Sequence, residues 1–243
     1  EKYNNELRSV SQKFKEAGVQ AVILDLRYNE GGSMDCVQLL GTILTSADRL
    51  GEPMAYLEYN DKNTDKDATI LFGTDREINL NLHSLIAITS GTTMGAPEML
   101  IRSLFLEDVY PIATVGSSTK GQNVATEQFI NEEFLWSVNP VVCTVYNSQH
   151  DTYGAISPAT DLKVSETTID GSTNYSEFLP FGTFDKDGKS ERLLKIAIGV
   201  LDGTYPPKDD KTPEESATQT HFKVEKSVSS PASRRFSSKG LRL

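Results

Sequence analysis

The sequence predicts a mixed α/β fold in which a layer of parallel strands and helices is followed by antiparallel hairpin strands. Three apolar runs rich in β-branched residues, 19–26, 82–90 and 111–116, each lead into a glycine-containing turn. Strands buried on both faces have this composition, and their alternation with helical periodicity is typical of a parallel sheet. Residues 123–146 change to short strand-like segments at hairpin spacing, which we expect to be added to the same sheet.

The first part of the chain predicts helix, strand, glycine turn and helix, in that order. Apolar residues recur at helical spacing from Tyr3 to Phe14, and Gly18 ends the predicted helix. Residues 19–26 predict a strand buried on both faces. After the turn 27–32, a second helix carries apolar side chains on one face: Val37, Leu40, Ile43 and Leu44.

The middle of the chain repeats this order of strand, turn and helix. Residues 82–90 predict a second buried strand, and a sharp turn leads to a helix over about 97–106. Pro97 suits the first turn of that helix, because its missing N–H would have no intrahelical partner there. Residues 111–116 predict the third parallel strand.

The end of the chain divides into a helix and a polar segment. A terminal helix is predicted over 190–203, and two prolines at 206 and 207 stop it. We therefore expect one core domain over residues 1–207 and a polar tail over 208–243. Within that tail, HFKVEK (221–226) is a candidate edge strand.

Composition and charge exclude several classes of partner. The 243 residues carry a formal net charge of −10, which disfavours nucleic acid or an anionic membrane as the main partner. No apolar run approaches the ~20 residues that span a bilayer, and no signal peptide is visible. Cys36 and Cys143 favour two buried thiols, with a disulfide left open. The three histidines lack metal-ligand spacing, so we expect no metal and no cofactor.

Four segments occur in an order that resembles the carboxyl-terminal processing, or tail-specific, peptidases. They are VILDLRYNEGG, ITSGTTMGAPE, VGSSTKG and YGAISPATDLKV, and the resemblance covers roughly residues 1–205. The members of this family are serine proteases with a Ser–Lys dyad. The resemblance implies a ClpP/crotonase-like core, and a peptide or an unfolded protein as the substrate.

The family's nucleophile falls on a glycine in this chain. The nucleophile turn reads approximately Ser/Thr-Ala-Ser-Ala-Ser-Glu, which here aligns with Thr93, Met94, Gly95, Ala96, Pro97 and Glu98. Lys120 lies 25 positions after Gly95, which suits the family's spacing, so the resemblance implies Lys120 as the general base. Glycine has no side chain to attack a peptide bond, and we expect covalent catalysis to be lost.

Other parts of the implied site do not depend on the serine. The resemblance implies that the amide of Ala96 and a glycine of the Gly31–Gly32 turn form the oxyanion hole. Thr93, Glu98 and Ser117 are expected to bind the substrate. Taken singly, these residues also have structural explanations, since a glutamate such as Glu98 suits the first turn of a helix and glycines suit tight turns.

Three functional hypotheses follow. The first is a catalytically silent family member that binds extended or C-terminal peptide segments, in part by β-augmentation of an edge strand. The second is an active serine endopeptidase, or one whose serine was replaced, that uses Lys120 as its base. The third is a crotonase-type acyl-transfer enzyme, for which no acyl-CoA signature is present. A displaced nucleophile is disfavoured, because reaction rates fall steeply with misplacement.

The resemblance also concerns domain context and location. Family members commonly carry an upstream PDZ-like domain, and this chain has no room for one before Glu1. We therefore expect a core fragment or a processed piece. The resemblance implies an exported protein of the periplasm or cell envelope.

Overall fold

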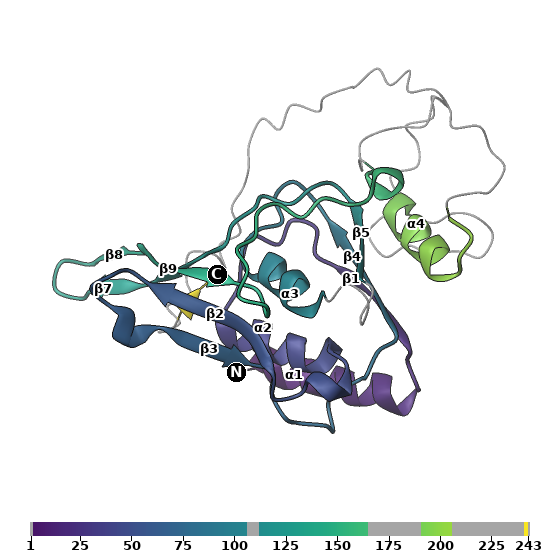
Figure 1. Ribbon diagram of the computed structural model, residues 1–243, viewed down its shortest axis with the longest axis horizontal. Helices are drawn as coiled ribbons and strands as arrows, with labels where there is room; N and C mark the ends of the chain where they lie inside the picture. The colour runs from purple at the N-terminus through teal and green to yellow at the C-terminus, as the bar shows by residue number, and fades with distance from the viewer. Residues whose placement is uncertain (1, 106–111, 165–190, 206–240, 243) are drawn as a thin grey trace, which may run out of the picture.

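The computed structural model describes residues 2–105, 112–164, 191–205 and 241–242 (Figure 1). The described elements, in chain order, are α1 (Lys2–Glu16), β1 (Ala21–Asp25), α2 (Met34–Leu44), β2 (Pro53–Tyr59), β3 (Ala68–Leu71), β4 (Ser84–Thr89), α3 (Ala96–Leu104), β5 (Ile112–Gly116), β6 (Val124–Glu127), β7 (Phe129–Asn131), β8 (Trp136–Val138), β9 (Val141–Tyr146), α4 (Arg192–Leu201) and β10 (Leu241–Arg242).

The first sheet is parallel, as predicted, with strand order β1-β4-β5. Its central strand β4 is almost fully buried, because both of its faces are covered by helices. Ile86 and Ile88 pack with α4 on one face, whereas Leu85 and Ala87 belong to the clusters that include α3. This alternation follows from the two-residue period of a strand.

The second sheet is antiparallel and has the strand order β10-β6-β9-β2-β3. Helices α2 and α3 lie between the two sheets (Figure 1), and their side chains share one core with Met54 of β2 and Val145 of β9. Our expectation that the hairpin strands extend the parallel sheet is therefore wrong. Gly116, with φ of 114°, turns the chain at the end of β5, so that it leaves the first sheet before β6 begins.

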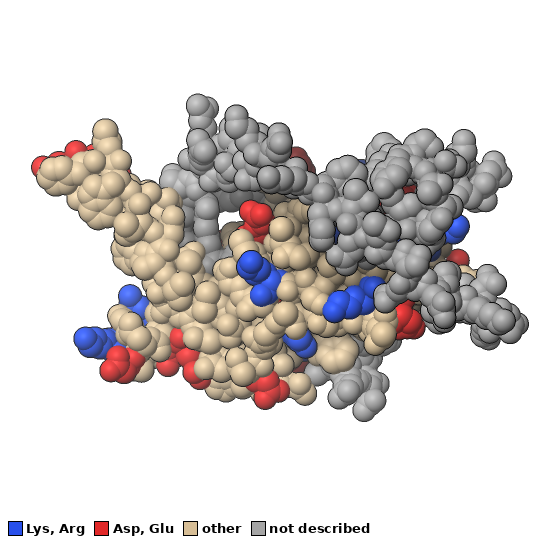
Figure 2. Space-filling view, turned by 90° about the horizontal axis from the view of Figure 1, so that it is seen from above, with Lys and Arg blue, Asp and Glu red and all other residues tan. Residues whose placement is uncertain are grey.

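Strands β7 and β8 form a separate two-stranded hairpin. It projects from the body of the molecule in Figures 1 and 2, and its turn carries Glu132 and Glu133. Large apolar side chains of the hairpin are exposed: Phe129, Ile130, Phe134, Leu135, Trp136 and Val138. A two-stranded hairpin alone is marginally stable, so its attachment to the second sheet supports it.

The predicted helices form, but the burial of helix α1 and of strand β1 differs from what the sequence predicts. Helix α1 forms where the periodicity predicts it, yet Tyr3, Val10 and Phe14 on its apolar stripe are exposed. Strand β1 is half-buried along most of its length instead of fully buried, because it lies at the edge of the described sheet. None of the described helices is both long and apolar enough to cross a membrane.

The two cysteines are free thiols, which excludes the disulfide, but Cys36 is only half-buried, so the expectation of two buried thiols is wrong for Cys36. Cys143 is buried, and this burial raises the pKa of its thiol to about 11. The expected boundary at residues 207 and 208 and the HFKVEK segment lie outside the described residues. Leu241 and Arg242, near the end of the expected tail, form a strand of the second sheet.

Candidate active site

Three turns meet at the carboxyl ends of the parallel strands, the edge where open α/β sheets bind ligands. They are the turn after β1 (26–33), the turn between β4 and α3 (90–95) and the loop between β5 and β6 (117–123). The first two belong together because β1 and β4 are paired, and the N–H of Leu26 continues this pairing to the carbonyl of Ile88 at 2.9 Å.

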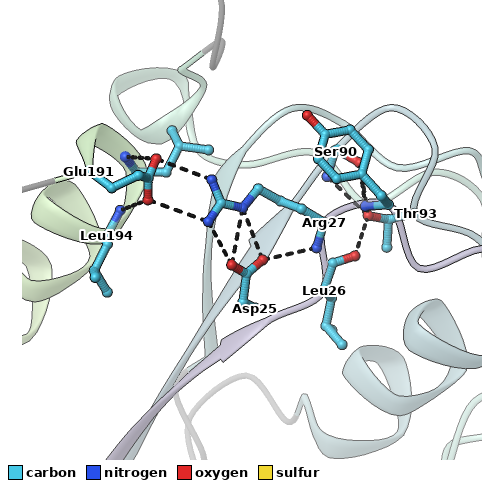
Figure 3. A network of polar contacts seen from close by, with 9 residues as sticks. Asp25, Leu26, Arg27, Ser90, Thr93, Glu191 and Leu194 are labelled. Atoms are coloured by element: carbon cyan, nitrogen blue, oxygen red, sulfur yellow. Dashed lines mark hydrogen bonds and ion pairs between the residues drawn. The ribbon is translucent and has the colours of Figure 1, made fainter. Parts of the chain in front are cut away.

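The turn before α3 is fixed to the backbone of the β1 turn at two points. The hydroxyl of Thr93 donates to the carbonyl of Leu26 at 2.8 Å (Figure 3). The N–H of Met94 donates to the carbonyl of Asn29 at 3.0 Å. The turn after β1 and the turn before α3, which lie far apart in the sequence, are thereby held next to each other.

The glycine turn lies against the start of α3. A Cβ built on Gly32 would lie 3.2 Å from the Cβ of Ala96, which is closer than most such contacts. Gly31 has φ of 135°, a conformation that side-chain-bearing residues rarely adopt. The structure thus brings together the two backbone segments that we expect to form an oxyanion hole. The amides of the first turn of a helix have no intrahelical partner and carry partial positive charge.

Gly95 immediately precedes α3 and has φ of 69° and ψ of −111°. Such a backbone conformation costs an L-residue about 1–3 kcal/mol, whereas glycine adopts it easily. The N–H of Gly95 donates to Oε2 of Glu98 at 2.9 Å. Gly95, where we expect the family's nucleophile, is therefore held in a defined turn and has no side chain to react.

Glu98 is completely buried and accepts four hydrogen bonds. Besides Gly95, its donors come from the loop between β5 and β6: the hydroxyl of Thr119, the N–H of Gly121 at 2.6 Å and the N–H of Gln122 at 2.8 Å. We expected Glu98 to contact substrate, but its carboxylate lies inside the protein. It joins the turn of Gly95 to the loop that carries Lys120.

Lys120 has a fixed backbone and an exposed side chain. Its N–H donates to the carbonyl of Thr93 at 2.9 Å, so the lysine loop is bonded directly to the turn before α3. The side chain itself is exposed. The partly desolvated site expected around a lysine base is therefore not formed by the described residues alone.

The other two residues expected to bind substrate also have structural partners. Thr93 is fully buried, and besides its bond to Leu26 it accepts from the N–H of Ser90 at 3.0 Å. Because it is fully buried, Thr93 supports the turn and does not reach a ligand. Ser117 is half-buried, and its carbonyl accepts from the hydroxyl of Thr89 at 2.8 Å.

Sequence reasoning missed a buried ion-pair network beside the site. Arg27 follows β1 and bonds to Asp25 and to Glu191, and Glu191 also accepts from the N–H groups of Leu193 and Leu194 at the start of α4 (Figure 3). The arginine after the apolar strand was visible in the sequence. Its partner lies 164 positions away, and no local pattern could have identified it.

Tyr153 packs in the core near Glu98. Burial raises the pKa of its phenol strongly, and the charge of Glu98 adds to this effect. The phenol oxygen has no hydrogen-bond partner among the described residues. At neutral pH the phenol of Tyr153 is therefore uncharged, and the side chain packs near Glu98 as part of the core.

Comparisons with known proteins show the family and the fold of this chain. The model of peptidase family S41 matches residues 1–139. A crystal structure of a candidate S41 protease from Bacteroides fragilis is similar, with 34% identity, a TM-score of 0.71, and coverage of 83% of this chain and 49% of that one. A candidate peptidase from Parabacteroides merdae has 20% identity and a TM-score of 0.51, over 82% of this chain and 56% of that one. The chain thus spans about half the length of these relatives. A comparison with curated protein sequences finds no match.

Proposed function

Because the chain belongs to peptidase family S41, we propose that it is a peptide-binding peptidase scaffold that has lost covalent catalysis at Gly95. The fold and the family are those of serine-type peptidases. The chain covers about half of the related structures, so the activity and substrates of a whole protein are part of the proposal.

The observation that carries the proposal is the Glu98 network. Its carboxylate binds the N–H of Gly95 and the N–H groups of Gly121 and Gln122. A chain that keeps this arrangement keeps the spatial relationship between the nucleophile position and the lysine loop. Within the aligned turn Met94, Gly95 and Pro97 depart from the family's pattern, and Gly95 lacks the side chain that covalent catalysis requires.

The chemical consequence follows from the roles of the parts. Backbone amides at Ala96 and Gly32 can still polarise a peptide carbonyl, because they do not depend on side chains. The N–H of Gly31 already donates to Oδ1 of Asn29 at 3.2 Å. Without a hydroxyl at Gly95, no acyl-enzyme can form and Lys120 has no proton to remove. Binding of an extended peptide is then the activity that remains.

The alternative is an endopeptidase that uses another hydroxyl together with Lys120. Two hydroxyls of the neighbouring turns contact other hydroxyls: Ser90 contacts Thr92 at 3.1 Å, and Ser118 contacts Ser157 at 3.0 Å. A nucleophile must also lie beside the oxyanion donors, and small displacements cost large factors in rate. Family membership removes the support for a crotonase-type enzyme.

The test is to restore the nucleophile and follow cleavage of an unfolded protein by mass spectrometry. We expect no cleavage by the unchanged chain or by Gly95→Ala, cleavage by Gly95→Ser, and loss of that cleavage in Gly95→Ser with Lys120→Ala. Gly95→Ala is the matched control, because it introduces the same backbone strain without a hydroxyl. Cleavage by the unchanged chain that Lys120→Ala abolishes would contradict the proposal and favour the alternative.

Location in the periplasm or cell envelope is part of the same proposal, and it rests on family resemblance alone. An export assay of the complete coding sequence fused to a reporter that is active only outside the cytoplasm would test it.

A further inference from the structure

Strand β6 carries a non-local partner on its outer edge. On its inner side β6 pairs with β9, and on its outer side Leu241 and Arg242 pair with Glu127 and Thr126. The two partners lie more than 100 positions apart in the chain. An outer edge strand presents unpaired N–H and C=O groups to any extended segment, and here a segment of the same chain occupies part of it.

The direction of this pairing relates the edge to the candidate active site. The start of β6 at Val124 follows Gly121 and Gln122 closely, and both of these amides are bonded to Glu98. Because β10 runs antiparallel to β6, an extended segment on this edge runs with its carboxyl end toward the lysine loop. Thr126 lies six positions after Lys120, a stretch that spans about 20 Å at most when fully extended.

The pairing is short and leaves room for a competitor. Only two residues of each strand are paired, and within the described residues Val124 and Ala125 have no strand partner on the outer edge. Main-chain hydrogen bonds supply the affinity when a peptide adds to a sheet edge, so a two-pair contact is readily displaced.

Charge indicates the chemistry of the segment that this edge accepts. Glu127 lies on β6, and Glu132 and Glu133 lie in the turn of the adjacent hairpin, whose tip shows acidic side chains in Figure 2. The segment 237–243, SSKGLRL, contains Lys239 and Arg242 and no acidic residue. Opposite charges steer association and favour one partner over others.

We propose that the outer edge of β6 binds extended basic peptides with their carboxyl end toward the lysine loop, and that Leu241–Arg242 is an intramolecular competitor for this edge. The inference deepens the proposed function, on which it rests, by naming the strand, the direction and the class of ligand. A tethered segment acts at high effective concentration, so it lowers the apparent affinity for a peptide in solution.

The test is a fluorescence-anisotropy titration with labelled SSKGLRL as the probe. Proteins to compare are the full chain, Leu241→Val, which retains a strand-forming residue, and a chain ending at Gly240, which lacks both paired residues. We expect the chain ending at Gly240 to bind the probe about tenfold more tightly than the other two. Equal affinity in all three proteins, or no binding to any of them, would overturn the inference.

Two control peptides and a second measurement separate the mechanism from nonspecific attraction. SSKGLRL that is N-methylated at its arginine should bind at least tenfold more weakly, because the methyl group removes the N–H of the residue that pairs with Thr126 and keeps the charge, and SSEGLEL should also bind weakly. Equal binding of the N-methylated peptide would refute backbone pairing. In hydrogen exchange, Thr126 should lose protection in the chain ending at Gly240 and regain it with the probe.

These outcomes are distinguishable from those of the proposed function. If Gly95→Ser cleaves protein while the probe never binds β6, the peptide-binding role of β6 is refuted and the proposed peptidase scaffold is supported. If the probe binds β6 but no Gly95 variant cleaves, the role of β6 is supported and the proposed roles of Gly95 and Lys120 are refuted.

Discussion

Arg27, just after β1, forms a buried ion pair with Glu191, just before α4, with Nη1 of Arg27 3.1 Å from Oε1 of Glu191 (Figure 3). The side chains are 2% and 8% exposed. Glu191 also accepts from the N–H groups of Leu193 and Leu194 at 3.0 Å, so the same carboxylate caps the helix. Helix α4 is thereby tied to the end of the strand that leads into the glycine turn.

Replacing Arg27 with methionine should destabilise the protein strongly. The carboxylate of Glu191 would stay buried without its cation, which typically costs about 3–5 kcal/mol. Urea denaturation would measure the loss in free energy of unfolding. The control is Arg8→Met, which breaks an exposed pair with Asp75 of 3.0 Å and should cost at most about 1 kcal/mol. Equal losses of unfolding free energy in the two variants would show that the buried ion pair contributes no more to stability than the exposed one.

Glu98→Gln should loosen the lysine loop. A carboxamide keeps one acceptor oxygen but places an NH₂ group against N–H donors, so buried amides of the network lose their partner. We expect a loss of about 2–4 kcal/mol in unfolding free energy, because hydrogen bonds to a charged group are replaced by unsatisfied donors. Hydrogen exchange of residues 119–122 should accelerate. The exposed Glu77→Gln is the control and should change neither quantity; unchanged exchange in Glu98→Gln would contradict the proposed link.

Gly95→Ala should be destabilising by about 1–3 kcal/mol, because φ of 69° with ψ of −111° disfavours any side chain. Gly91→Ala tests the same chemical change in the same turn. Gly91 has no positive φ, and a Cβ there would meet no atom within 4 Å. Thermal unfolding of both variants should therefore show a clear decrease for Gly95→Ala and little change for Gly91→Ala. Comparable melting temperatures would mean that the turn relaxes freely.

Glu58 should make stability depend on pH in the acid range. Hydrogen bonds from His150, with Nε2 2.8 Å from Oε1, and from Tyr146 lower the pKa of Glu58 below its ordinary value of 4.5. The folded state thus favours the carboxylate, and the contribution is present above pH 4.5 and lost as pH falls through the lowered pKa. Melting temperatures from pH 6 to 3 should fall more steeply for the unchanged chain than for Glu58→Gln. Parallel curves would exclude this contribution.

The local elements of the fold could be predicted because their signals are local. The apolar strand 82–90 became β4, and Pro97 does lie in the first turn of α3. The register from Gly95 to Lys120 stays a prediction that rests on the order of motifs. Burial was harder to predict: the stripe of α1 has helical spacing, yet Tyr3 is 68% exposed, because periodicity does not reveal which surface a helix contacts.

The sequence by itself determined the family, the parallel layer and the absence of a side chain at Gly95, since each depends on neighbouring residues or on identity at one position. Tertiary structure alone decided that the later strands form a second sheet, that Glu98 faces inward to bind Gly121 and Gln122, and that Arg27 meets Glu191. These relationships join segments far apart in the chain. They are set by which buried charges and amides must be satisfied when the layers pack, and no local pattern encodes that requirement.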